Sequence, residues 1–519
     1  MNVRTRTALC VFSVCLGAGL MTGCSRLPSL ENRSTSTALA SDEAKTTRLG
    51  QAISPRLAAH PGKTGLYSLT NAQNAFATRF LLAQAAERTL DVQYYIWRKD
   101  LTGGLLFEAL HAAAERGVRV RLLLDDNNTS GLDSTLAALD SHPNIEVRLF
   151  NPFAIRAPRW INYLTDFSRA NRRMHNKSFT ADNQATIVGG RNVGDEYFGA
   201  TDGVLFADMD VLAVGPVVQD VSNDFDRYWA SDSSYPVSTL LPRADPARLG
   251  ELAADATLIE RDSAAAAYMN ALRDSALIRE LVNGDLTMVW AKTRLVSDDP
   301  GKGLGLASPE QLLTHELAQI LGKPESETEL ISPYFVPTAA GVDAFSRMAE
   351  RGVQIKVLTN SLAATDVAAV HAGYAKWRKP LLEAGIKLYE MRRTSPESEK
   401  SKSAGPFGSS GSSLHAKTFS VDRSRAFVGS FNFDPRSAKL NTELGFVIDS
   451  PEMARQIAAA FDAVIPANAY EVRLSDTGQL YWLEQLNGKA VRYDTEPATT
   501  FWQRAGVKFL SVLPIEWLL

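Results

Sequence analysis

Residues 174–192 read MHNKSFTADNQATIVGGRN, and residues 414–432 read LHAKTFSVDRSRAFVGSFN. The two stretches place the same residue types at the same spacing: His175, Lys177, Asp182, Gly189, Gly190 and Asn192 in the first, and His415, Lys417, Asp422, Gly429, Ser430 and Asn432 in the second. A lone His-x-Lys is common by chance, but a long pattern that occurs twice is not. The repeat therefore indicates two related halves that carry the same chemistry.

The spacing suits a phosphate-binding site. In an extended strand, residues i and i+2 point to one side, so His175 projects with Lys177 and His415 with Lys417. Two such strands that meet across a pseudo-twofold axis bring two imidazoles and two ammonium groups into one pocket. The lysines supply positive charge for phosphate oxygens. The imidazoles titrate near neutral pH and can attack or transfer a proton.

Two further features of the repeat are expected to serve the same phosphate. Asn192 and Asn432 would donate amide hydrogens to it, and the small residues before them would let the backbone approach it closely. No cluster of carboxylates suggests a metal ion. We therefore expect lysine to supply the positive charge and expect no metal or other cofactor in the reaction.

Strands alternate with helices around both motifs. In the first half the patterns predict strands at 89–97, 116–125 and 145–150 and a helix at 104–116; in the second half they predict strands at 329–336, 351–360 and 386–389 and a helix at 339–351. Gly117 and Gly352 are expected to end the two helices. The alternation implies βαβ units. We expect an α/β fold of two tandem domains, each a mostly parallel mixed sheet flanked by helices, related by a pseudo-twofold axis with one shared active site.

Composition narrows the class of protein. The chain has 519 residues, of which 45% are apolar and 22% are charged, so most of it is globular. Its net charge of −3 argues against a protein that coats nucleic acid. All three cysteines, Cys10, Cys15 and Cys24, lie at the N-terminus, so no disulfide or zinc–thiolate site is expected in the body of the chain.

The first residues look like a targeting signal. Arg4 and Arg6 precede a short apolar segment, and Met21 to Cys24 reads MTGC, which resembles a bacterial lipobox. We expect 1–23 to be a lipoprotein signal peptide and Cys24 to be lipidated; an ordinary cleaved signal or an uncleaved anchor is the alternative. Ser25 favours the outer membrane. The expected location is the periplasmic side of a bacterial cell envelope.

The remaining boundaries follow from composition. We expect a tether at 24–60, an N-terminal domain at 61–235, a helical connector at 236–325, a C-terminal domain at 326–470 and an extension at 471–519 that contacts the membrane interface. Residues 392–413 are rich in Ser, Gly and Lys and predict a mobile loop, either a lid or a tolerated insertion. Basic and aromatic residues before the first motif are expected to face anionic lipid; they are Arg156, Arg159, Trp160, Arg169, Arg172 and Arg173.

The repeated motif resembles the phospholipase D superfamily, whose pattern is H-x-K-x4-D-x6-G-[GS]-x-N. The resemblance implies a covalent phosphohistidine, with His175 as nucleophile and His415 as acid and base. It groups Asp182 and Asp422 with the catalytic motif, although such aspartates usually tie down the local turn. Glu443 matches the family carboxylate that orients a histidine. Its counterpart in the first half is Asp208 or Glu196, and Asp208 is preferred.

Longer stretches resemble bacterial cardiolipin synthases, the C-type most closely. They include LDVQYYIW (90–97), RGVRVRLLLDDNN (116–128), WAKTRLVSDDP (290–300) and GSFNFDPRSAKLNTELGF (429–446). The resemblance implies transfer of a phosphatidyl group from phosphatidylglycerol or phosphatidylethanolamine onto phosphatidylglycerol, at a membrane surface, by a single chain that holds both half-sites. It also places His371 and Tyr374 near the pocket, where a headgroup contact is conceivable. His60, His111, His142 and His315 are expected to be ordinary.

Three other functions stay open. A phospholipase D hydrolase would use water on the same intermediate and release phosphatidic acid. A phosphodiesterase or nuclease of the same superfamily would bind nucleic acid, which the charge disfavours. A non-catalytic lipid-binding module would be expected to lack a histidine or lysine in one motif, whereas both motifs are complete here.

Overall fold

The computed structural model describes residues 27–200, 207–244, 250, 268–270, 280, 285–393, 414–486 and 488–519. The expected signal peptide and Cys24 lie outside the described residues. So do most of the expected loop at 392–413 and much of the segment 245–284.

The first half is a sheet with the strand order β8-β4-β3-β2-β5-β6-β7-β1. Its strands are β1 (Thr64–Leu69), β2 (Thr89–Ile96), β3 (Arg119–Asn128), β4 (Ile145–Phe150), β5 (Ser178–Ala181), β6 (Ala185–Gly189), β7 (Asp210–Val214) and β8 (Ser234–Pro236). The helices are α4 (Ala72–Ala85), α5 (Leu101–Glu115), α6 (Asp133–Asp140), η1 (Arg159–Ile161), α7 (Asn162–Thr165), α8 (Phe167–Ala170), α9 (Asp195–Phe198), α10 (Pro216–Trp229) and α11 (Val237–Leu240).

The second half repeats this order as β15-β14-β13-β10-β11-β12 and adds β16, β17 and β18 at the far edge. Its strands are β10 (Glu327–Ile331), β11 (Gln354–Asn360), β12 (Lys387–Met391), β13 (Thr418–Val421), β14 (Arg425–Gly429), β15 (Leu444–Asp449), β16 (Ala469–Leu474), β17 (Leu480–Leu486) and β18 (Lys489–Tyr493). The helices are α15 (Leu313–Leu321), α16 (Thr338–Glu350), α17 (Ala368–Ala375), α18 (Arg378–Glu383), α19 (Pro435–Lys439), α20 (Pro451–Ala459), η4 (Ala460–Val464), α21 (Ile465–Asn468), α22 (Phe501–Ser511) and η5 (Glu516–Leu518).

Both sheets are mixed, as expected, but antiparallel strand pairs outnumber the parallel ones. Among the strands that the structure describes, the parallel pairs are those of β2, β3 and β4 in the first half and of β10, β11 and β12 in the second. The predicted helices 104–116 and 339–351 join the first two strands of each group, and unpredicted helices join the third: α6 in the first half, α17 and α18 in the second. The motif strands β5–β6 and β13–β14 form antiparallel hairpins against the parallel strands, because a short turn can join only antiparallel neighbours.

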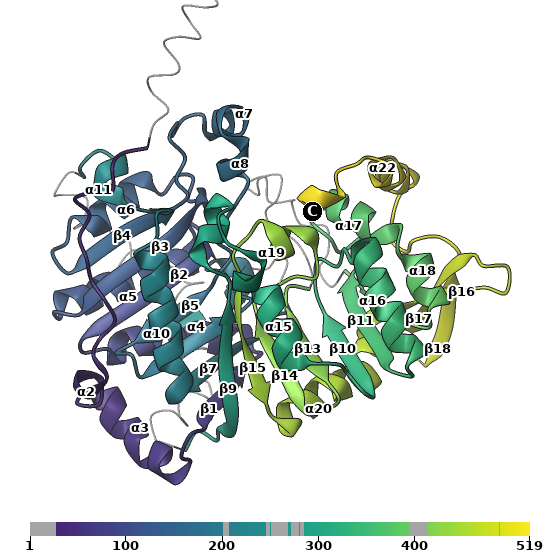
Figure 1. Ribbon diagram of the computed structural model, residues 1–519, viewed down its shortest axis with the longest axis horizontal. Coiled ribbons are helices and arrows are strands. Elements are labelled where there is room, and N and C mark those ends of the chain that lie inside the picture. The colour runs from purple at the N-terminus through teal and green to yellow at the C-terminus, as the bar shows by residue number, and fades with distance from the viewer. Residues whose placement is uncertain are drawn as a thin grey trace, which may run out of the picture.

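One long strand in the expected helical connector joins the halves. Strand β9 (Val289–Ser297) pairs with β1 through its first residues and with β15 through its last ones. The two sheets are therefore one continuous sheet, and β9 and β15 lie side by side at the centre of the molecule (Figure 1). Two short helical turns, η2 (Pro300–Leu304) and η3 (Pro309–Gln311), follow it before α15.

An apolar core holds the halves face to face. It combines Val188, Val211 and Val217 from β6, β7 and α10 with Val428 and Phe446 from β14 and β15, all of them buried. Separate cores fill the remainder of each half. Because β6 and β14 lead directly into the motif residues, this packing positions both motifs at one interface.

The predicted helices and strands of both halves are present within a few residues of their expected bounds. Gly117 and Gly352 follow α5 and α16, each with a φ of 90°, a left-handed conformation that glycine adopts without strain.

The expected tether is partly packed on the first half. It contains α2 (Ser41–Ala44) and α3 (Arg48–Ala59). Ahead of them, the carbonyls of Ser34 and Ser36 accept hydrogen bonds of 2.6 and 2.9 Å from Arg148 and Arg121. The two guanidinium groups hold the backbone around Ser34 and Ser36 against the first half. The composition of this segment does not predict such packing.

The C-terminal extension completes the second half. Strands β16 to β18 widen its sheet, and α22 packs on α17 through the buried Val507. Among the described residues, no helix combines the length and apolar character needed to cross a bilayer.

Candidate active site

The two motifs meet through a symmetric exchange of backbone contacts. Met174 forms a parallel bridge with Thr442, and Ala207 forms one with Leu414. The His175 N–H donates to the Thr442 carbonyl, and the His415 N–H donates to the Ala207 carbonyl, both at 2.9 Å. The residue after each acceptor is a carboxylic acid, so each motif histidine lies beside an acid from the opposite half.

These acids bond to the histidine side chains. His175 Nδ1 lies 2.8 Å from Glu443 Oε2, and His415 Nδ1 lies 2.6 Å from Asp208 Oδ2, with all four residues buried. The structure thus brings Asp208, the preferred candidate, to the histidine. Glu196 instead forms an ion pair with Arg98 at 3.2 Å. A carboxylate on Nδ1 fixes the ring and leaves Nε2 for chemistry.

The motif lysines fold back onto their own histidines. Lys177 and Lys417 each donate from Nζ to the carbonyl of the histidine two residues earlier, at 2.5 Å. Lys417 Nζ also lies 3.1 Å from His415 Nε2. The i and i+2 residues therefore share one side of the chain, as expected, although regular strand begins only after the lysine.

The charges of each motif act on the histidine of the other. Burial lowers the pKa of His175, and the charges of both Lys177 and Lys417 lower it further. Burial and Lys417 likewise lower the pKa of His415 to about 3. Burial lowers the pKa of Lys177 well below its ordinary value and that of Lys417 to about 8. A concentrated positive charge of this kind favours an anionic ligand.

The two orienting acids differ in their protonation. Burial raises the pKa of Glu443 to about 7 despite the nearby charge of Lys177. Burial also acts to raise the pKa of Asp208, but His415 and Lys417 more than offset it, and that pKa lies below its usual value. The carboxylate beside His415 is therefore the one that keeps its charge near neutral pH.

A second layer of buried ions, missed by the sequence analysis, supports these acids. Asp298 accepts from the Glu443 N–H at 2.9 Å and forms an ion pair with Lys302 at 2.8 Å. In the first half, Arg191 donates to the Asp208 carbonyl at 2.7 Å, and Arg79 pairs with Asp210 at 2.8 Å. Asp298 lies in WAKTRLVSDDP (290–300), a stretch that resembles the cardiolipin synthases, and this resemblance was the one sequence feature that could have indicated its role.

The small motif residues make room for acids instead of for a ligand. A Cβ on Gly189 would lie 2.2 Å from Asp210 Oδ1, and one on Gly190 would lie 2.3 Å from Asp208 Oδ1. In the second motif the space is used differently, because Ser430 donates from Oγ to the Glu443 carboxylate. The small residues are thus explained by the packing of these acids, and the expected close approach of the backbone to phosphate stays a prediction.

The motif asparagines are both buried but differ in their bonds. Asn192 accepts from the Ile96 N–H at 3.2 Å and donates to the Tyr197 hydroxyl at 3.1 Å. The Tyr197 ring meets His415 edge to face, with centroids 5.2 Å apart. Asn432 has a buried side-chain oxygen that bonds to nothing in the described part of the chain. Asn192 thus positions Tyr197. The unbonded Asn432 oxygen is an acceptor, so it suits a hydroxyl donor of a ligand and not the phosphate oxygens that we expected this side chain to contact.

The motif aspartates serve the fold. Asp182 accepts from the backbone N–H groups of Arg88 and Thr89 at 2.8 and 2.9 Å, which fixes the start of β2. Asp422 does the same for Ser326 and Glu327 at 2.7 and 3.1 Å, ahead of β10. Their grouping with the catalytic residues is corrected accordingly, and the alternative of a turn-holding role fits.

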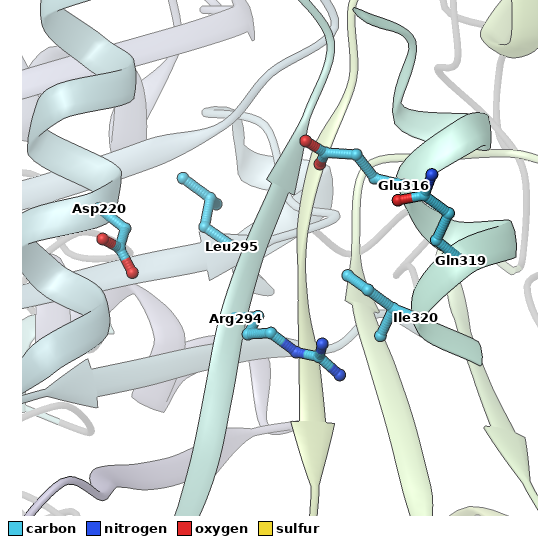
Figure 2. Close-up of a pocket in the computed structure, with 6 residues that line it drawn as sticks. All are labelled: Asp220, Arg294, Leu295, Glu316, Gln319 and Ile320. Atoms are coloured by element: carbon cyan, nitrogen blue, oxygen red, sulfur yellow. The ribbon is translucent and has the colours of Figure 1, made fainter. Parts of the chain in front are cut away.

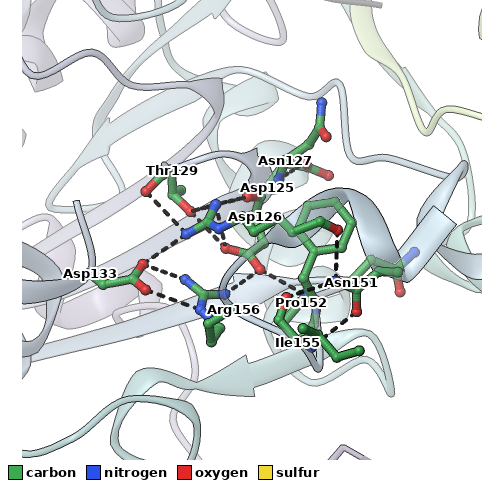
Figure 3. A network of polar contacts seen from close by, with 12 residues as sticks. Asp125, Asp126, Asn127, Thr129, Asp133, Asn151, Pro152, Ile155 and Arg156 are labelled. Atoms are coloured by element: carbon green, nitrogen blue, oxygen red, sulfur yellow. Dashed lines mark hydrogen bonds and ion pairs between the residues drawn. The ribbon is translucent and has the colours of Figure 1, made fainter. Parts of the chain in front are cut away.

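The arginines expected to face lipid are mostly engaged in a polar network (Figure 3). Arg156 bridges Asp126 and Asp133, and Arg159 donates to Asp133 at 2.8 Å. Arg173 contacts Asp125 at 3.4 Å, and the remaining two, Arg169 and Arg172, donate to backbone carbonyls. Arg156, Arg159 and Arg173 pair with acids more than twenty residues upstream, which local sequence could not reveal. Arg169 also pairs with the nearby Asp166 at 2.6 Å. Trp160 alone of the group is largely exposed.

His371 and Tyr374, considered above as contacts for a lipid headgroup, bond instead to other residues of the protein. His371 Nε2 lies 2.7 Å from Arg378 Nη2 and 3.2 Å from Glu496 Oε1, and Tyr374 donates to Glu390 at 3.1 Å. This buried network ties α17 and α18 to β12.

A pocket of about 260 Å³ lies elsewhere, between α10, β9 and α15 (Figure 2). It is lined by Asp220, Arg294, Leu295, Glu316, Gln319 and Ile320. None of these residues belongs to either motif, so the pocket is not the site of the motif chemistry.

Two domains of this architecture, each contributing one His-Lys motif to a common centre, define a phospholipase D-type protein. A family model described as "Cardiolipin synthase, PLD-like domain" matches residues 81–229 and 317–465. The chain is 53% identical to cardiolipin synthase C of Escherichia coli (strain K12) over 474 residues, which covers 91% of this chain and all of that protein. The chain therefore belongs to the cardiolipin synthase family, as its sequence predicted.

More distant comparisons agree on the fold. Cardiolipin synthase A of Pseudomonas aeruginosa is 25% identical and covers 82% of this chain and 71% of its own. The crystal structure of phosphatidylserine synthase from Haemophilus influenzae superposes with a TM-score of 0.56 at 14% identity, over 90% of this chain and all of that one. At that identity the likeness concerns the fold alone.

Proposed function

We propose that this chain is a phosphatidyltransferase that makes cardiolipin by transferring a phosphatidyl group onto the free hydroxyl of phosphatidylglycerol. The donor is a second phosphatidylglycerol or phosphatidylethanolamine. The observation that carries the proposal is the crossed pairing of His175 with Glu443 and His415 with Asp208 beside two buried lysines. The 53% identity to a cardiolipin synthase supports the choice of lipid substrates.

The geometry suits a two-step displacement. In the first step His175 Nε2 attacks phosphorus, the bond to the leaving alcohol breaks, and His415 gives that oxygen a proton from Nε2. In the second step the acceptor hydroxyl returns a proton to His415 and attacks phosphorus, and the N–P bond breaks. The lysines neutralise the phosphate oxygens in both steps.

The assignment of roles rests on the two carboxylates. His415 faces Asp208, the acid that keeps its charge, and an ionised carboxylate stabilises the protonated imidazole that a general acid needs. An arriving phosphate adds a negative charge that offsets the lysines and raises the pKa of His415. Glu443, with its pKa of about 7, supports a neutral His175 that can attack.

A lipid assay tests the proposal. Purified protein is mixed with phosphatidylglycerol vesicles, with and without phosphatidylethanolamine, and the products are resolved by mass. We expect cardiolipin together with glycerol or ethanolamine, and the released alcohol identifies the donor. Phosphatidic acid as the sole product would mean that water is the acceptor, and the hydrolase interpretation would replace this one.

We infer that the chain works at a membrane surface through a face built by both halves. Exposed apolar side chains lie on η1 to α8 in the first half and on α22 and η5 in the second; they are Trp160, Leu164, Phe167, Phe501, Trp502, Phe509, Val512 and Trp517. Arg436 joins these parts, since it donates to the carbonyls of Asn171 and Leu518 at 3.0 Å. Helices α7, α8 and α22 lie along the upper edge in Figure 1.

Vesicle binding checks this face. Trp502→Ser and Phe509→Ser should weaken sedimentation with anionic vesicles, because each removes apolar area from the interface. Val464→Ser is the matched control, as Val464 is also exposed but ends η4, the helical element that follows α20. Helix α20 lies at the lower edge of Figure 1, away from α7, α8 and α22. Equal losses for all three variants would contradict the assignment.

We further propose that the mature protein is a lipoprotein of a bacterial cell envelope, anchored on the periplasmic side through Cys24. The lipobox-like sequence MTGC supports this. Cys24→Ser should release the protein from membranes into the soluble fraction or leave its precursor unprocessed. Unchanged processing and fractionation would contradict it.

A further inference from the structure

A cluster of metal-ligating side chains lies apart from the motifs, between α5 and the start of β4. Helix α5 carries His111 and, one turn later, Glu115. His142 follows α6, and its ring meets that of His111 at a right angle with centroids 5.7 Å apart. His142 Nε2 lies 3.1 Å from Glu115 Oε1.

His111 is the unusual member of this cluster. Only 9% of the surface of His111 is exposed. Neither of its ring nitrogens makes a hydrogen bond to any residue that the structure describes. Nδ1 is 3.5 Å from Glu108 Oε2, and Nε2 is 3.6 Å from Glu115 Oε1. Buried polar atoms without hydrogen bonds are rare in folded proteins and commonly indicate a bound water or ion.

We propose that His111, Glu115 and His142 bind a divalent transition metal of the zinc class. Their ligand atoms all lie within 4.8 Å of one another. Tetrahedral coordination at bond lengths of about 2.0–2.1 Å separates ligand atoms by about 3.4 Å, so small side-chain shifts complete the site. Two imidazoles and a carboxylate are a donor set that zinc favours, with solvent in the fourth position.

The surroundings supply the supporting contacts. With a metal on Nε2 of His111, the Nδ1 hydrogen faces Glu108 Oε2, which lies 3.5 Å away. A small shift of Glu108 would make it the supporting acceptor, as carboxylates behind ligating histidines are. Glu115 is exposed on one side and gives the ion a path from solvent. His142 Nδ1 now accepts from the Asn144 N–H at 3.1 Å. Metal binding at Nε2 places the ring hydrogen on Nδ1, so this one backbone bond is exchanged for a metal bond.

The site ties the end of α5 to the turn before β4. It stabilises the first half and takes no part in phosphoryl chemistry, because none of its members contacts a motif residue. A ligand that binds only the folded state raises thermal stability by mass action. Metal is therefore expected to raise the unfolding temperature while a chelator leaves the initial transfer rate unchanged.

The test uses the full chain without a histidine tag, stripped by chelator and dialysed. Calorimetric titration with Zn²⁺ and thermal unfolding are compared for wild type, Glu115→Gln, His142→Gln and the control His315→Gln, whose histidine is exposed on α15. We expect wild type and control to bind one strong Zn²⁺ and to unfold at a higher temperature with it. Each of the other variants should lose at least 10-fold in affinity.

Equal Zn²⁺ affinity in Glu115→Gln and wild type would overturn the proposal, as would a metal that leaves the unfolding temperature unchanged. Glu115 is exposed, so this variant is expected to fold and decides the matter if His142→Gln does not. Both readouts are independent of lipid turnover, so the result does not depend on the proposed transferase activity.

Discussion

At the scale of single residues, the exchange of acids between halves determines the chemistry. A His175 ring held by Glu443 presents Nε2 in one orientation, and His415 depends on Asp208 in the same way. Loss of either carboxylate frees the ring without removing the reacting atom. Each acid is therefore a positioning residue for a histidine in the other domain.

Glu443→Gln and Asp208→Asn should each lower kcat about 10- to 100-fold, the usual cost of losing such a supporting contact. KM for phosphatidylglycerol should change little, because the lysines remain. Glu196→Gln is the control, since Glu196 pairs with Arg98 away from the histidines. A Glu196 variant as damaged as the other two would refute the crossed arrangement.

The buried lysines set the alkaline limit of the reaction. Burial lowers the pKa of Lys417 to about 8, so it is charged below that pH and loses its proton as the pH rises through it. Transfer from phosphatidylglycerol alone should therefore decline above about pH 8. In Lys417→Arg the residual activity should persist to higher pH, because guanidinium stays protonated. A decline only near the ordinary lysine pKa of about 10.4 would contradict this explanation.

At the scale of elements, the motif aspartates anchor the first parallel strand of each half. Asp182 is fully buried and bonds to three successive backbone N–H groups. Asp422 makes the equivalent bonds in a partly exposed position. Water can replace the second carboxylate but not the first.

Asp182→Ala should accordingly cost about 1.5–3 kcal/mol of stability, the range for bonds to a buried charge, and Asp422→Ala should cost less. Calorimetric unfolding of the two variants measures the difference. Each variant is the control for the other, because Asp182 and Asp422 occupy equivalent positions in the two motifs. A larger drop in unfolding temperature for Asp422→Ala would be inconsistent with burial as the cause.

Helices and strands whose own residues carry a clear pattern were predicted from the sequence. The helices ending at Gly117 and Gly352 and the strands around them were predictable because capping and β-branched runs are local signals. Strand β9 was not predicted, because the alternation of Lys292 and Arg294 with less polar residues is too short to outweigh the helical pattern expected for the connector around it. Its strand conformation comes from partners on both sides, β1 and β15.

At the scale of the whole molecule, duplication explains the site. The repeated motif predicted the family and the two tandem domains, and these are confirmed. It also predicted that each lysine lies beside its own histidine, which is the arrangement in the structure. The sequence could not place Asp298 and Lys302 behind Glu443, because they lie more than a hundred residues away along the chain. Nor could it reveal that Arg156 and Arg159 bond to Asp126 and Asp133, because these pairs form only when the chain after β4 folds back over the end of β3.

The central claim is that one chain contains one complete site made from both halves. Transfer from phosphatidylglycerol is measured for His175→Ala, for His415→Ala and for an equimolar mixture of the two. We predict no turnover in any of the three samples, because every chain then lacks one of the two imidazoles. Near-normal activity in either variant, or recovery of activity on mixing, would contradict a site shared within a single chain.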